Sequence, residues 1–134
     1  MSINMNYIVF AILYLLVDVI WITGMSKVFY RHKIAKVQSA PLTFKLIPAG
    51  LAYVTLLITM FFVCIPLSEH YRNKKHALKP WMVFGLVGFC IYGVYNFTNG
   101  AIFKHYDSSF MLVDTAWGCV SFSFFGYIYT LLIT

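Results

Sequence analysis

The sequence predicts an all-α membrane protein with four transmembrane helices in an antiparallel bundle. Hydrophobic residues make up 61% of the 134 residues and charged residues only 10%, against about 25% charged in an ordinary soluble domain. A soluble fold of this size must cover its surface with polar side chains, and this composition supplies too few of them. Four apolar stretches are each long enough for the roughly 20 residues that a helical span requires.

The predicted spans differ mainly in whether a charge interrupts them. The second and third carry no charged residue, whereas Asp18 interrupts the first and Asp114 the fourth. All four runs are continuously apolar rather than alternating, which disfavours a membrane β-barrel. The whole chain, 1–134, is expected to form one domain. The predicted spans cover residues 7–25, 46–67, 81–103 and 110–133.

The connections hold most of the charge. The formal net charge is +6, and the cations lie beside apolar runs, which fits anionic lipid headgroups. No nucleic-acid-binding module is evident. Within the connection Ser26–Lys45, apolar residues interleave with cations, so this element is expected to lie on the headgroup layer, and Pro41 is expected to end it. The first and third connections together carry more Lys and Arg than the second, which favours their side as cytoplasmic.

Polar side chains in three of the spans fall at similar depths. An ionisable side chain within a span is costly and therefore a candidate functional residue. A rise of about 1.5 Å per residue puts Asp18 roughly 11 Å and Asp114 roughly 6 Å from the same membrane surface. Asn96 and Asn99 of the third span lie roughly 10 and 6 Å from it. We therefore expect one polar cluster in one leaflet.

Each aspartate stands three residues before a tryptophan, so both members of the pair share a helix face. In the third span, Gly85 and Gly88 would let a neighbouring helix approach closely, and the hydroxyl and amide groups that follow would donate to a buried carboxylate. The same groups could instead serve only to hold the helices together. The candidate ligand-binding or polar cluster comprises Asp18, Trp21, Tyr92, Tyr95, Asn96, Thr98, Asn99, Asp114 and Trp117.

Motifs for catalysis or metal binding are not evident. The three cysteines lie inside apolar runs and are expected to stay reduced. There is no phosphate loop, serine nucleophile elbow or zinc-protease helix. No cofactor is indicated, and no metal site is expected, because the histidines of the connections lack metal-ligand spacing. These are His32, His70, His76 and His105.

Short motifs along the chain carry a family resemblance. They are an Asp-x-x-Trp at Asp18–Trp21, a Phe-Tyr-Arg at Phe29–Arg31, a Tyr-Asn-Phe-Thr-Asn at Tyr95–Asn99 and a Val-Asp-x-x-Trp-Gly at Val113–Gly118. From Leu15 to about Gly126, the chain resembles the predicted four-helix membrane proteins known as domain of unknown function twenty-one seventy-seven.

This resemblance implies a fold and no activity. The family usually has Asp where Asn96 stands, so this chain keeps the hydrogen-bonding shape of that position and lacks its charge. The difference argues against a metal or proton role for Asn96 itself.

Three functions fit these features. The first is a small non-enzymatic membrane protein whose polar intramembrane site binds or passes a small ligand, proton or cation. The second is an intramembrane enzyme or accessory subunit acting on lipids, with Asp18 and Asp114 as acid and base or metal ligands and Asn99 orienting the substrate. The third is a structural component of a cellular or viral membrane, in which the cluster only holds the helices together.

The expected partners follow from the predicted membrane location. The lipid bilayer surrounds a multi-pass protein of this kind, although the sequence does not indicate which membrane. Four helices are few for a complete transport path, so a homo-oligomer or a larger membrane complex is expected if the chain transports a ligand.

Overall fold

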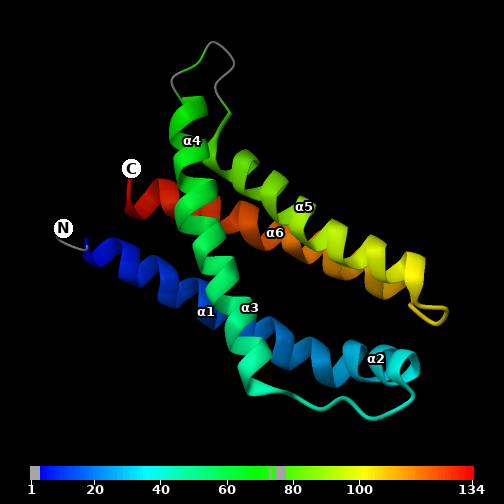
Figure 1. Cartoon of the computed structure of the whole chain (residues 1–134). Coiled ribbons are helices and arrows are strands. Elements are labelled where there is room, and N and C mark those ends of the chain that lie inside the picture. The colour runs from blue at the N-terminus through cyan, green and yellow to red at the C-terminus, as the bar shows by residue number, and fades with distance from the viewer. Residues whose placement is uncertain (1–3, 73, 75–77) are drawn as a thin grey trace.

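A computed structural model describes residues 4–72, 74 and 78–134 of the chain, and its regular elements there are helices (Figure 1). Within this described part, four helices are long and apolar enough to cross a membrane: Met5–Gln38, Leu46–Arg72, Pro80–Ile102 and Ser108–Leu132. The prediction of an all-α membrane fold with four spans is therefore confirmed. His76, one of the four histidines of the connections, lies outside the described residues.

The first helix is much longer than predicted. It comprises α1 (Met5–Met25), a wide π-helical turn η1 (Ser26–Tyr30) and α2 (Arg31–Gln38). Its 34 residues correspond to about 51 Å, which exceeds the about 30 Å of a hydrocarbon core. The prediction that the whole of 26–45 is a connection was wrong, because the interleaved cations and apolar residues continue the helix beyond its apolar part.

The first connection is therefore short. Ser39 ends α2 in a left-handed conformation with φ 55°, a common way to end a helix. Pro41 follows two residues later rather than ending the helix itself.

The second helix also continues past its predicted end. It comprises α3 (Leu46–Thr59), a second wide turn η2 (Met60–Cys64) and α4 (Ile65–Arg72). Pro66 lies two residues beyond the wide turn. A proline inside a helix removes a backbone donor and clashes with the carbonyl four residues earlier, and a wide turn at that place accommodates it.

The helices α5 (Pro80–Ile102) and α6 (Ser108–Leu132) lie side by side along their length (Figure 1). Pro80 is the first residue of α5, and Asp107 caps the start of α6 by accepting hydrogen bonds from two backbone N–H groups. A Cβ on Gly88 would lie 2.2 Å from the Gly118 carbonyl oxygen. The close approach expected at the glycines of this span is therefore present.

These two helices run in opposite directions. Gly126, near the end of α6, faces Trp81 near the start of α5. At the other end of the pair, Gly100 faces Met111. An antiparallel arrangement of all four helices stays a prediction.

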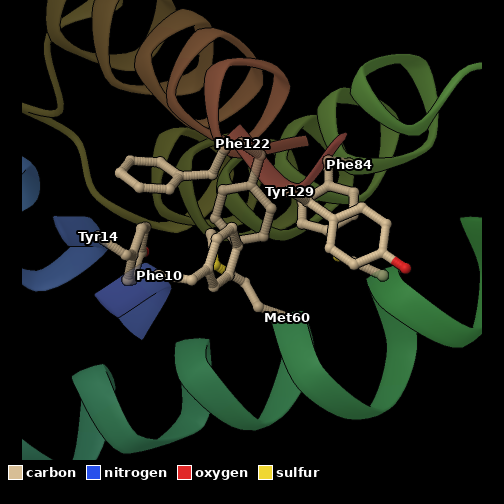
Figure 2. Close-up of a cluster of buried hydrophobic side chains, with 8 residues drawn as sticks. Phe10, Tyr14, Met60, Phe84, Phe122 and Tyr129 are labelled. Carbon is tan, nitrogen blue, oxygen red and sulfur yellow. The ribbon is translucent and has the colours of Figure 1, made fainter. Parts of the chain in front are cut away.

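An aromatic core joins all four long helices (Figure 2), and it uses the first half of α1 and the second half of α6. The Phe10 and Phe125 ring centroids lie 5.6 Å apart with the rings nearly perpendicular. In the same halves of these two helices, Asn6 Nδ2 donates to the backbone oxygen of Leu132 at 2.6 Å. The core comprises Phe10, Tyr14, Met60, Cys64, Phe84, Phe122, Phe125 and Tyr129.

Candidate functional site

Asp18 lies in the contact between α1 and α6. Its side chain is only 2% exposed, and its Oδ1 accepts a hydrogen bond from Trp117 Nε1 at 3.0 Å. The Tyr53 hydroxyl of α3 is a further neighbour of this carboxyl. Three of the long helices thus meet at one acidic side chain, which lies one turn beyond the aromatic core on α1.

The two Asp-x-x-Trp motifs face each other across this contact. The indole rings of Trp21 and Trp117 stack in parallel planes with centroids 3.9 Å apart. Trp21 Nε1 donates to the Tyr30 hydroxyl at 3.1 Å, and that hydroxyl donates to Asp114 Oδ1 at 3.2 Å. The predicted pairing of Asp and Trp on one face of each helix therefore produces a contact between the two motifs.

Asp114 is held from a second side by α5. Its Oδ2 accepts from Asn96 Nδ2 at 2.7 Å, and Asn96 is fully buried. The Asn96 Oδ1 accepts in turn from the Tyr106 hydroxyl at 2.6 Å. Burial raises the pKa of Tyr106 to about 12, so this hydroxyl keeps its proton and remains a donor at neutral pH.

From here on, the polar cluster means the set of side chains that the structure connects, which differs from the predicted set. Hydrogen bonds and one aromatic stack join its members, and it draws on the first helix, α5, the turn after α5, and α6. Its members are Asp18, Trp21, Tyr30, Asn96, Tyr106, Asp114 and Trp117.

The wide turn η1 explains how Tyr30 reaches this cluster. In an uninterrupted α-helix, Tyr30 would follow Trp21 by about two and a half turns and point from the opposite face. The π-helical turn takes up one extra residue, as the backbone hydrogen bond from Arg31 to the Ser26 oxygen shows. Because this turn rotates less per residue than an α-helix, the Tyr30 ring is directed toward α6, where it packs on Phe110 with centroids 4.9 Å apart.

The two intramembrane carboxyls differ from the other two acidic residues in their partners. Asp107 lies 2.7 Å from Lys33, and Glu69 lies 3.2 Å from Arg72. Within residues 4–72, 74 and 78–134, no Lys, Arg or His lies within salt-bridge distance of Asp18 or Asp114. Burying a carboxylate in an apolar medium without a counter-ion is costly, and binding a proton or a cation relieves that cost.

A half-buried ion pair lies beside the cluster on the side of the connections. Lys33 Nζ of α2 donates to Asp107 Oδ2, and Asp107 also accepts from Ser109 and from the backbone N–H of Phe110. The hydrogen bond from Lys33 is the largest of the effects that hold the pKa of Asp107 below its ordinary value. This contact ties the projecting end of the first helix to the start of α6.

Not every predicted residue joins the cluster. Tyr95 is 59% exposed, Thr98 is also exposed and Asn99 is half-buried, and Asn96 rather than Asn99 donates to a carboxylate. Tyr92 lies at its border, because its backbone oxygen accepts from Asn96 and its ring lies where a Gly118 side chain would be.

Sequence reasoning missed two members, Tyr30 and Tyr106. The sequence predicts a connection at Tyr30, and the Phe-Tyr-Arg motif indicated a family resemblance without indicating the direction of this side chain. Tyr106 lies in the turn between α5 and α6, where spacing along a helix gives no indication of direction.

A cavity of about 610 Å³ lies beside the cluster, between the first helix and the start of α3. Tyr53 lines this cavity and also neighbours the Asp18 carboxyl of the cluster. The cluster itself offers few metal ligands. No group of three or more His, Cys, Asp or Glu side chains that could hold a metal occurs in the described part of the chain.

A known family model matches most of the chain. A family model described as "Predicted membrane protein (DUF2177)" matches residues 3–131. No curated protein and no solved structure matches the chain.

Proposed function

The chain belongs to the DUF2177 family of predicted membrane proteins, and we propose that this multi-pass membrane protein binds a proton or a small cation at the Asp18 and Asp114 carboxyls. One observation carries the proposal. Both carboxyls lie in helices apolar enough to span a membrane, and neither has a cationic side chain within salt-bridge distance among the described residues.

The hydrogen bonds of the cluster support binding rather than permanent charge. Asp18 accepts one hydrogen bond from an indole, and Asp114 accepts one from a phenol and one from an amide. These are neutral donors, each worth about 0.5–1.5 kcal/mol in net stability. The penalty for an unpaired buried carboxylate is several kcal/mol, so the donors orient the carboxyls without offsetting their charge.

The Trp21–Trp117 stack couples the two carboxyls. Asp18 is bonded to one indole of the stack and Asp114 is connected through Tyr30 to the other. A change of charge at one carboxyl would therefore shift the stack that the other depends on. Binding at the two positions is expected to be interdependent.

Infrared spectroscopy tests this proposal. The purified protein in neutral phosphatidylcholine nanodiscs should show the C=O stretching band of a protonated carboxyl at neutral pH, and Asp18→Asn or Asp114→Asn should reduce it. Alternatively, thermal stability should rise when sodium replaces N-methylglucamine, and the same variants should abolish that rise. Asp107→Asn, in the turn before α6 and paired with Lys33, is the matched control and should alter neither signal.

Two results would contradict proton or cation binding. Fully ionised carboxyls together with a stability that does not respond to cations would leave the cluster as a means of holding helices together, the structural alternative. Strictly additive effects of Asp18→Asn and Asp114→Asn on stability would contradict the coupling between them.

A specific observation also favours an enzyme or accessory subunit acting on lipids. Tyr53 both lines the cavity and neighbours the Asp18 carboxyl, so one side chain stands between a molecule in the cavity and that carboxyl. Turnover of a lipid that is lost in Asp18→Asn, with folding retained, would favour this second function.

A further inference from the structure

We propose that the cavity between the first helix and α3 binds one anionic phospholipid, with its phosphate at Lys27 and Arg31 and an acyl chain directed toward Tyr53. The inference goes beyond proton or cation binding, because it assigns a ligand to a different set of side chains. The cavity volume of about 610 Å³ lies in the range of about 300–1,000 Å³ typical of small-molecule sites, enough for one chain rather than a whole lipid.

The lining residues of the first helix are ordered by polarity. Val19 and Ile22 come first, the hydroxyl residues Thr23 and Ser26 follow, and the cations Lys27 and Arg31 come last. Arg31 lies twelve residues after Val19, a distance of about 18 Å along the helix. A phospholipid has the same order over its length, from acyl chain through ester and glycerol to phosphate.

The opposite wall is apolar or small along most of its length. Leu46, Ala49 and Gly50 of α3 line it, with Tyr53 at the inner end. A Cβ added to Gly50 would meet no atom within 4 Å, so the space beside this residue is free. An acyl chain is the membrane component that fits an apolar space between two helices.

The cations at the outer end have no acidic partner in the described part of the chain. None of the lining residues is acidic, and the ion pairs there use Lys33 and Arg72 instead. Lys27 and Arg31 are both exposed and lie four residues apart across the wide turn. Two unpaired cations at a membrane surface attract a lipid phosphate, at about 1 kcal/mol each.

Native mass spectrometry tests the assignment. The protein is released from detergent containing equal amounts of phosphatidylcholine and phosphatidylglycerol, and the retained lipid is identified. We expect one phosphatidylglycerol per chain. The double variant Lys27→Gln with Arg31→Gln should lower its retention about 30-fold. The matched control, Lys36→Gln with Lys45→Gln, removes the same charge outside the cavity and should lower it by about twofold at most.

A second pair of variants tests the acyl chain. Gly50→Leu fills the free space of the cavity and should reduce phosphatidylglycerol retention. Gly24→Leu adds the same side chain to the first helix, where a Cβ also meets no atom within 4 Å, and should leave retention unchanged. Circular dichroism and thermal unfolding of both variants establish that each is folded.

Four outcomes would overturn the proposal. Equal losses in the two double variants would mean general attraction of cations to a surface. Unchanged retention in Gly50→Leu would place the lipid elsewhere. Displacement by glycerol phosphate at equal concentration would mean that only the headgroup binds, and retention of a copurifying protein instead of lipid would make the cavity a protein interface.

Failure here is separable from failure of the proposed function. Asp18→Asn leaves Lys27, Arg31 and Gly50 in place, so lipid retention should persist in that variant. Conversely, loss of lipid in the Lys27 and Arg31 double variant should leave the protonated-carboxyl band unchanged.

Discussion

Trp21 and Trp117 lie in parallel planes with ring centroids 3.9 Å apart, and this stack joins the first and last spans at the level of their carboxyls. Stacked aromatic rings contribute about 0.5–1.5 kcal/mol beyond the area they bury. The contact is also a spectroscopic probe, because the chain contains only three tryptophans.

Circular dichroism should detect the stack directly. Two indoles in contact give an exciton couplet, so Trp21→Phe and Trp117→Phe should each abolish it. Trp81→Phe is the control, since Trp81 is 44% exposed on α5, and should retain the couplet. A couplet that persists without Trp21 would contradict the stack.

Asn96→Leu should destabilise the protein more than Asn99→Leu. The first variant leaves Asp114 Oδ2 and the Tyr106 hydroxyl without their partner. An unsatisfied buried group costs about 1–3 kcal/mol, and a hydrogen bond between transmembrane helices contributes about 0.6 kcal/mol on average. Asn99 makes no comparable contact with a carboxylate among the described residues. Thermal unfolding in detergent measures both, and equal melting temperatures would count against the cluster.

Gly118→Ala should weaken the contact of α5 with α6. A Cβ at this position would lie 2.3 Å from Tyr92 Cγ, and such overpacking costs about 1–3 kcal/mol. Gly24→Ala places the same methyl group where nothing lies within 4 Å and should be neutral or slightly stabilising. The prediction fails if the two variants unfold at the same temperature.

Acid should weaken the contact between α2 and the start of α6. Lys33 holds the pKa of Asp107 below its ordinary value of 3.8, so the ionised carboxyl contributes stability above that value, and the contribution is lost as the pH falls through the lower pKa of the folded state. Wild-type melting temperature should therefore fall on acidification below about pH 4 more than that of Asp107→Asn. Parallel acid profiles for the two proteins would refute this.

Accessibility labelling should place the connections on two sides of the membrane. In a cysteine-free background, single cysteines at Ser39 and Ser108 should react from one side, and those at Lys74 and Thr134 from the other. All four positions are exposed. Labelling of Ser39 and Lys74 from the same side would contradict the four-span antiparallel bundle.

The apolar runs were enough to predict the number of spans, because lipid requires about 20 apolar residues per crossing. The same criterion could not find the ends of the first two helices. Beyond Met25 and Leu67, cations and polar residues continue the helix outside the apolar region, where hydropathy no longer indicates helix or connection.

The candidate site was predictable where it follows helix spacing. In each of two helices a tryptophan follows an aspartate by three residues, and the structure joins all four side chains: Asp18, Trp21, Asp114 and Trp117. The position of Tyr30 was not predictable, because a wide turn changes the face it occupies. The contribution of Tyr106 depends on the path of a five-residue turn, which no periodicity describes.

The first helix is longer than the membrane it crosses, and this has a mechanical consequence. A helix of about 51 Å in a hydrocarbon core of about 30 Å must tilt or project beyond the core. The amount of tilt and the length that projects change with bilayer thickness. Arg31 and Lys33 lie on the projecting part, so thickness sets their height relative to the lipid phosphates. Thin and thick membranes would therefore present the mouth of the cavity at different levels, which would make the protein responsive to the kind of membrane around it.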